Sequence, residues 1–64
     1  MSESAEIRAQ HAQRIFEKVV NAHRAGQLDE AIAGYVRTLD IDSDYFQALN
    51  NMGVALRAQG AFHA

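Results

Sequence analysis

The most informative absence in this 64-residue sequence is that of cysteine. Without thiols, the chain can form neither a disulfide framework nor a thiolate metal site, and it has no cysteine nucleophile. A chain of this size hides only about 60% of the surface that its unfolded form exposes, so its core is marginal. We therefore expect one small domain that gains stability from contacts beyond its own core.

Basic charge and long apolar runs are also scarce. The net charge of −2 and pI near 5.8 leave no basic surface of the kind that binds a phosphate backbone, so we expect no nucleic-acid partner. The polar start, Met1–Arg8, lacks the apolar run of a secretion signal. No stretch is apolar over the roughly 18 residues that indicate a transmembrane helix. We expect no membrane partner and a cytoplasmic location.

The residue types that could carry catalysis or bind a metal do not occur at the spacing that such sites need. None of His11, His23 and His63 lies three or four residues from another histidine or from a carboxylate on its helical face, whereas a zinc site needs three or four convergent ligands. The acidic run at 40–44 lacks the glycine and terminal glutamate of a calcium-binding loop. No phosphate-binding glycine loop and no Ser/His/Asp arrangement occurs. We expect no catalytic residues, metal or cofactor, and a protein that is not an enzyme.

Apolar residues recur at spacings of three and four along the whole chain, the pattern of amphipathic helices. Gly26 is placed to end a first helix, because glycine accepts the positive φ found just past a helix C-terminus. We expect Gly60 to end a third helix in the same way. The sequence thus predicts an all-α fold of antiparallel helix–turn–helix units, with helices at 5–25, 28–41 and 45–59 and a truncated start of a fourth at 60–64.

Three packing expectations follow from these helices. Gly34 in the middle of the second helix costs about 1 kcal/mol relative to alanine, so we expect it to permit close helix approach. Asp44 is expected to cap the third helix, with Gln47 completing a capping box. The third helix is expected to turn one set of residues inward: Ala48, Leu49, Met52, Gly53, Ala55 and Leu56.

The glycine corner at Arg24–Ile32 returns 34 residues later at Gln59–Phe62, and a fixed period of this length marks a repeat architecture. The first copy is carried by Gly26, Leu28, Glu30, Ala31, Ile32, Tyr35 and Leu39. The second is carried by Ala48, Leu49, Asn51, Met52, Gly53, Ala55, Leu56, Gly60 and Phe62. Over about residues 12–64 the chain resembles the tetratricopeptide repeat (TPR) family, as about one and a half repeats.

Four positions depart from the family pattern. Lys18 stands where the family usually has a large apolar residue, and Val19 where it usually has a small one. We therefore expect a shifted or looser contact of the first helix. Thr38 replaces a small alanine, and Ser43 replaces the proline that commonly closes a repeat. Tyr35 is expected to fill the gap between helices.

The resemblance implies a protein–protein interaction module with a groove lined by the first helix of each repeat. Carboxamides there can donate to and accept from a peptide backbone, while Phe16 and two valines offer apolar contact. We expect Asn51 to bind a partner's backbone; Glu17 stands at the equivalent place in the first copy. A solvated face with incidental amides remains the alternative. The candidate groove residues are Gln13, Phe16, Glu17, Val20, Arg24, Gln47, Asn50, Asn51, Val54 and Arg57.

Two further interpretations stay open. The chain could be the N-terminal repeat fragment of a larger bacterial enzyme, such as a glycosyltransferase, sulfotransferase or methyltransferase, and the gene beyond Ala64 would decide this. A third helix with no following helix also predicts self-association, as a homodimer. The residues expected to carry it are Leu49, Met52, Leu56 and Phe62.

Overall fold

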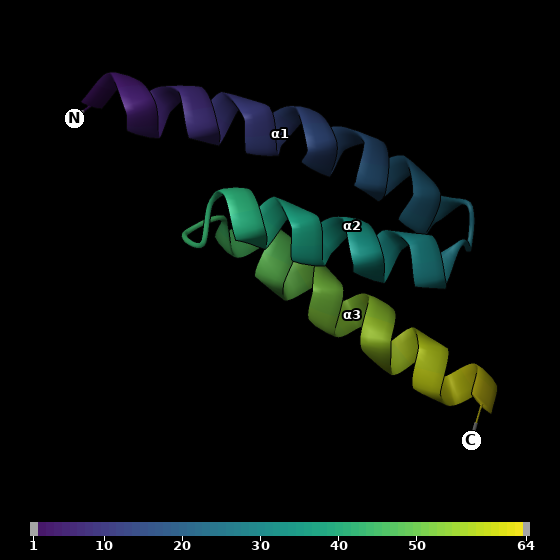
Figure 1. The fold of residues 1–64 in the computed structure, drawn as a ribbon. Helices are drawn as coiled ribbons and strands as arrows, with labels where there is room; N and C mark the ends of the chain where they lie inside the picture. The colour runs from purple at the N-terminus through teal and green to yellow at the C-terminus, as the bar shows by residue number, and fades with distance from the viewer. Residues whose placement is uncertain (1, 64) are drawn as a thin grey trace.

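Three helices form the structure, a computed structural model that describes the backbone of residues 2–63 and the side chains of residues 4–61. Helix α1 spans Ser2–Arg24, α2 spans Leu28–Ile41 and α3 spans Phe46–His63. Successive helices run antiparallel, and α2 packs against both α1 and α3 (Figure 1). The expected all-α fold is confirmed. No helix within the described residues combines the length and apolar character needed to cross a membrane.

The corner between α1 and α2 forms as the sequence predicts. Gly26 adopts a φ of +80°, the left-handed conformation that glycine accepts without a Cβ clash. Its N–H donates to the carbonyl of His23 at 3.0 Å, and the N–H of Gln27 donates to the carbonyl of Ala22 at 3.0 Å. These two bonds form a Schellman motif, which satisfies the last carbonyls of α1 and reverses the chain.

The helix boundaries agree with the sequence at α2 and differ elsewhere. Helix α1 begins ahead of the expected Ala5, and α3 continues through Gly60 to His63 instead of ending at Gln59. Among the described residues, Gly26 is the glycine with positive φ. Glycine permits a left-handed residue but does not impose one, so Gly60 stays within the helix.

The α1–α2 interface is built on a valine facing a glycine. A Cβ on Gly34 would overlap the Cγ2 atom of Val19 and lie 3.0 Å from its Cγ1 atom. Val19 is 7% exposed. The looser contact expected from Val19 is therefore wrong, because the missing side chain of Gly34 makes room for the larger one. Gly34 serves close helix approach, as expected.

The core itself is small and rich in alanine. Ala31, Ala48 and Ala55 are fully buried, and they allow the helices to pack around the ring of Tyr35, which is also fully buried. The Thr38 side chain is buried too, and its hydroxyl donates to the carbonyl of Gly34 at 2.9 Å. This bond satisfies a polar group that would otherwise be costly to bury.

Helix α3 turns only part of its expected inward set toward α2. Ala48 and Ala55 are buried and Met52 packs against the core. Leu49 and Leu56, however, are 53% and 47% exposed, so their expected inward placement is wrong. The reason is geometric: each lies one residue past a buried alanine, which rotates it about 100° away from α2 around the helix axis.

Candidate functional site

The first and third helices together line one open cavity of about 470 Å³. It has an apolar side, formed by Phe16 and Val20 of α1 with Phe46 at the start of α3. Its amide side consists of Gln47, Asn50 and Asn51 of α3. We call these six residues the α1–α3 groove. It places hydrogen-bonding amides opposite apolar contact area, a combination suited to a peptide.

The structure brings together half of the groove residues expected from sequence. Phe16, Val20, Gln47, Asn50 and Asn51 all line the cavity. The other five are exposed and lie outside its lining: Gln13, Glu17, Arg24, Val54 and Arg57.

Phe46 was missed by sequence reasoning, although it is 73% exposed and lines the groove. It lies four residues before Asn50, and residues at this spacing occupy one face of a helix. That spacing was the available signal.

An aromatic cluster supports the apolar side of the groove. The ring centroid of Phe16 lies 5.0 Å from that of Tyr45 and 6.0 Å from that of Tyr35. Burial raises the pKa of Tyr45, and the carboxylates of Glu17 and Asp42 raise it further. Phe16 is thus held between Tyr35 of α2 and Tyr45, which directly precedes α3. These contacts fix its ring in the groove wall.

The hydroxyl of Tyr35 joins α2 to α1. The Nδ1 atom of His23 lies 2.7 Å from it, and the two rings meet edge to face with centroids 5.7 Å apart. Burial raises the pKa of Tyr35, while the side chain of Asn51 acts in the opposite direction. The buried ring of α2 is therefore held to α1 through its hydroxyl.

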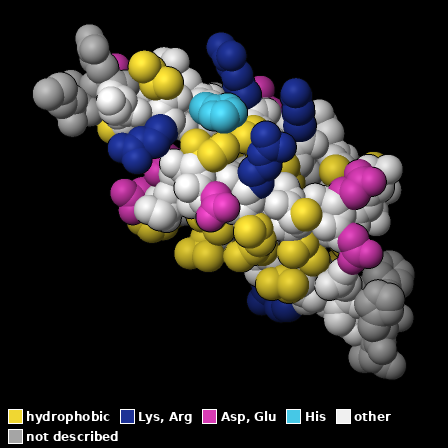
Figure 2. Space-filling view, in the orientation of Figure 1, with side chains coloured by type: hydrophobic (Ala, Val, Ile, Leu, Met, Phe, Trp, Pro, Cys, Tyr) yellow, Lys and Arg dark blue, Asp and Glu magenta, His cyan; other side chains and the backbone are white. Residues whose placement is uncertain are grey.

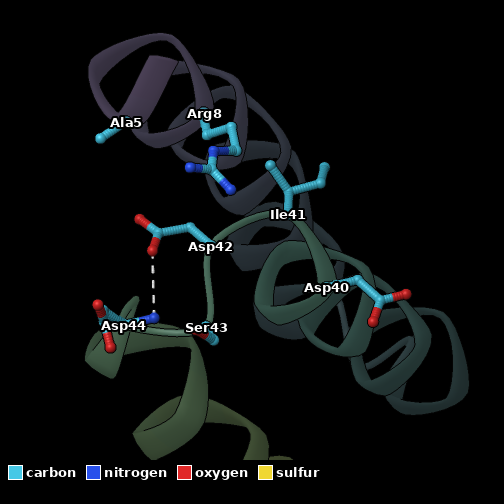
Figure 3. A pocket seen from close by; sticks show the side chains of 7 residues that line it. All are labelled: Ala5, Arg8, Asp40, Ile41, Asp42, Ser43 and Asp44. Atoms are coloured by element: carbon cyan, nitrogen blue, oxygen red, sulfur yellow. Dashed lines mark hydrogen bonds between the residues drawn. The ribbon is translucent and has the colours of Figure 1, made fainter. Parts of the chain in front are cut away.

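A second, polar cavity of about 330 Å³ lies where the α2–α3 turn approaches α1 (Figure 3). Arg8 faces the acidic turn across it. The Asp42 carboxylate accepts from the Asp44 N–H at 3.1 Å, and the N–H of Asp42 donates to the Thr38 carbonyl at 2.9 Å. Asp42 thus organises the turn. The expected cap by Asp44 is not formed, because α3 begins at Phe46, two residues later.

Within the part of the chain that the structure describes, no group of three or more His, Asp or Glu side chains is arranged to hold a metal ion. The acidic turn at 40–44 is accounted for by its backbone hydrogen bonds.

One face of α3 is uncovered. Leu49, Gly53 and Leu56, at spacings of four and three, lie along it, and we call them the open α3 face. A Cβ on Gly53 would meet no atom within 4 Å. Apolar side chains gather over the α2–α3 half of the molecule, and Lys and Arg mostly over the α1 half (Figure 2). Of the other residues expected to self-associate, Met52 packs against the core and the Phe62 side chain lies outside the described residues.

Three antiparallel helices with a groove between the first and third define a helical-repeat protein of the kind that binds other proteins. The family profile of the TPR repeat matches residues 23–60, more than half of the chain. The chain therefore belongs to the TPR family, whose members are scaffolds for protein interactions. No curated protein and no solved structure matches it significantly.

Proposed function

We propose that this chain binds an extended peptide segment of a partner protein in the α1–α3 groove. The supporting observation is the single cavity in which Phe16, Val20 and Phe46 face three carboxamide side chains. An extended peptide exposes one N–H and one C=O at each residue, and a carboxamide can pair with both. Its side chains alternate in direction, so one of them would reach the apolar side of the groove.

Phe46→Ala tests the groove with little risk to the fold, since the side chain is 73% exposed. A peptide selected from a random display library on the unaltered protein would serve as the probe. Losing a large aromatic contact should weaken binding by about 1–2 kcal/mol, roughly tenfold. Isothermal titration calorimetry would measure the affinity, with Val36→Ala as the control because Val36 is 49% exposed on α2 and outside the groove. Equal affinity of both variants would place the peptide elsewhere.

Asn50→Ala and Asn51→Ala separate the two groove asparagines. Removing either backbone-binding amide should weaken binding of the probe peptide by about 1–2 kcal/mol. Asn50 is exposed, so its variant should melt like the parent, whereas Asn51 is half-buried. A variant that unfolds but keeps its affinity would remove that asparagine from the groove. The same results are expected if this repeat precedes the catalytic domain of a larger enzyme. The reading frame beyond Ala64 distinguishes that alternative.

Self-association is a second candidate, favoured by the open α3 face. Leu49 and Leu56 flank Gly53, where open space allows another backbone to come close. Within α3, Arg57 is the one Lys, Arg, Asp or Glu side chain, so two copies would meet with little charge repulsion. A symmetric pair would cover the face on both copies. Sedimentation over a hundredfold range of concentration tests it, and a concentration-independent monomer would exclude it.

A further inference from the structure

The exposed ring of Phe46 borders two cavities. One is the α1–α3 groove, and the other is a smaller, open cavity of about 250 Å³ lined by Asp44, Tyr45, Phe46 and Gln47. We call the smaller one the Asp44 cavity. Phe46 and Gln47 line both cavities, so they form the ridge between them. The Phe46 side chain is 73% exposed, so a ligand that crosses this ridge would meet its ring.

The two cavities differ in charge. The groove is lined by apolar and carboxamide side chains, whereas the smaller cavity holds the Asp44 carboxylate beside two aromatic rings. Asp44 does not cap α3, which begins two residues later, and its carboxylate points away from the Arg8 guanidinium (Figure 3). The N-terminus of α3 carries about half a positive charge, less than the combined negative charge of Asp42 and Asp44 just before it. The Asp44 cavity therefore favours a cation.

A single aromatic ridge between two cavities suits an extended peptide. Side chains two residues apart point to the same side of an extended chain and lie about 6.8 Å from each other. A phenyl ring that contacts one side chain on each face needs about 7 Å between them, which is twice a van der Waals contact of about 3.5 Å. Two such side chains can therefore straddle the Phe46 ring, with one in each cavity.

We propose that the peptide bound in the α1–α3 groove carries a large apolar residue and, two residues away, a lysine or arginine that enters the Asp44 cavity. The apolar residue contacts Phe16, Val20 and Phe46 in the groove. The basic side chain lays its aliphatic stem along the aromatic rings and places its charge at the Asp44 carboxylate. This inference rests on the proposed peptide-binding function and adds the ligand's sequence, an apolar–x–basic pattern in either chain direction.

Selection from a random display library on the unaltered protein is the first test. Peptides whose binding falls about tenfold on Phe46→Ala are groove ligands, and these should share a lysine or arginine two residues from an apolar residue. Groove ligands without this pattern would overturn the inference and leave the proposed function standing. If the selected peptides bind Phe46→Ala as tightly as the parent, the proposed function fails, and the inference fails with it.

Asp44→Asn then tests which side chain receives the basic residue. Asp40→Asn is the matched control, because it removes the same charge from an exposed residue of the same acidic turn that does not line the Asp44 cavity. With a selected peptide as the probe, Asp44→Asn should weaken binding about fivefold at low salt, and Asp40→Asn by less than about twofold. Equal effects of the two variants would overturn the inference.

Replacing the basic residue of that peptide by norleucine keeps an aliphatic side chain and removes the charge. The norleucine peptide should bind both variants as tightly as it binds the parent, which also shows that their grooves are intact. Asp44→Lys should reverse the preference, so that glutamate at this peptide position binds better than lysine. A preference for lysine that survives Asp44→Lys would place the basic residue outside the Asp44 cavity and overturn the inference.

Discussion

The same face of the repeat occurs twice in this chain, once covered and once open. On α1, Ile15 and Val19 pack into the core with α2. Their counterparts 34 residues later are Leu49 and Gly53 on α3, where Leu49 is 53% exposed and Gly53 has open space around it. In a repeat protein each helix contacts only its neighbours. One sequence position can therefore be core in one copy and surface in the next.

The two mid-helix glycines show the same contrast. Gly34 has the side chain of Val19 directly over it, whereas a Cβ at Gly53 would meet nothing within 4 Å. Both weaken their helices by about 1 kcal/mol relative to alanine. At Gly34 the interface with α1 explains that weakness. At Gly53 no contact within the single chain explains it. Alanine substitutions at the two positions should therefore change the free energy of unfolding in opposite directions.

Tyr35→Ala should have the largest effect, because it removes the side chain on which both interfaces of α2 depend. The ring is fully buried and contacts Phe16 and His23. Truncating a buried aromatic residue costs about 3–5 kcal/mol, close to the whole stability expected of so small a domain. Circular dichroism should show a largely unfolded chain at 25 °C. An unchanged melting temperature would contradict the central position of Tyr35.

Gly34→Ala should be the next largest in effect. The new Cβ would overlap Val19, and overpacking of this kind typically costs about 1–3 kcal/mol. The gain in helix propensity offsets up to about 1 kcal/mol of that cost. Urea denaturation would measure the change in the free energy of unfolding.

The double variant Val19→Ala, Gly34→Ala supplies the control for this interpretation. Removing both Cγ atoms of Val19 eliminates the overlap, so the two substitutions should be less destabilising together than the sum of their separate effects. Strict additivity would show that Val19 and Gly34 do not share a contact.

Much of the fold follows from local sequence signals, and what escapes prediction depends on neighbours. The glycine corner and the bounds of α2, Leu28–Ile41, are fixed by periodicity and by Gly26, so they could be predicted. The pairing of Val19 with Gly34 could not, since each residue looked unfavourable alone and only their contact explains both. The outward rotation of Leu49 depends on which side of α3 meets α2.

The groove shows the same division. Helical spacing placed Asn50 and Asn51 on one face, and both line the cavity. Spacing alone does not show how far a cavity extends along a helix, so it also included Arg24 and Arg57, which lie outside the lining, and it omitted Phe46. The contacts of Phe16 with Tyr35 and Tyr45 join residues on different elements and have no sequence signature.

Gly53→Ala should stabilise the isolated chain, in contrast to Gly34→Ala. The added methyl group meets no atom within 4 Å, and alanine favours a helix by about 1 kcal/mol over glycine. A higher urea midpoint with an unchanged slope is the expected result. A destabilised variant would mean that the open α3 face is already covered in solution. Sedimentation of the same sample would then give the mass of the assembly.

The smallest effect on folding, and the sharpest test of the open α3 face, is expected from Leu49→Gln combined with Leu56→Gln. Both leucines are about half exposed, and exposed substitutions usually change the free energy of unfolding by less than about 0.5 kcal/mol each. If two copies pair through this face, the double variant should lose the concentration-dependent mass seen for the parent, because each copy would bury polar amides in place of leucine. Val36→Gln is the matched control, since Val36 is 49% exposed on α2 and outside that face. Should both variants sediment alike, self-association through Leu49 and Leu56 is excluded, and the exposed face of α3 would differ from the covered face of α1 only in lacking a neighbouring helix.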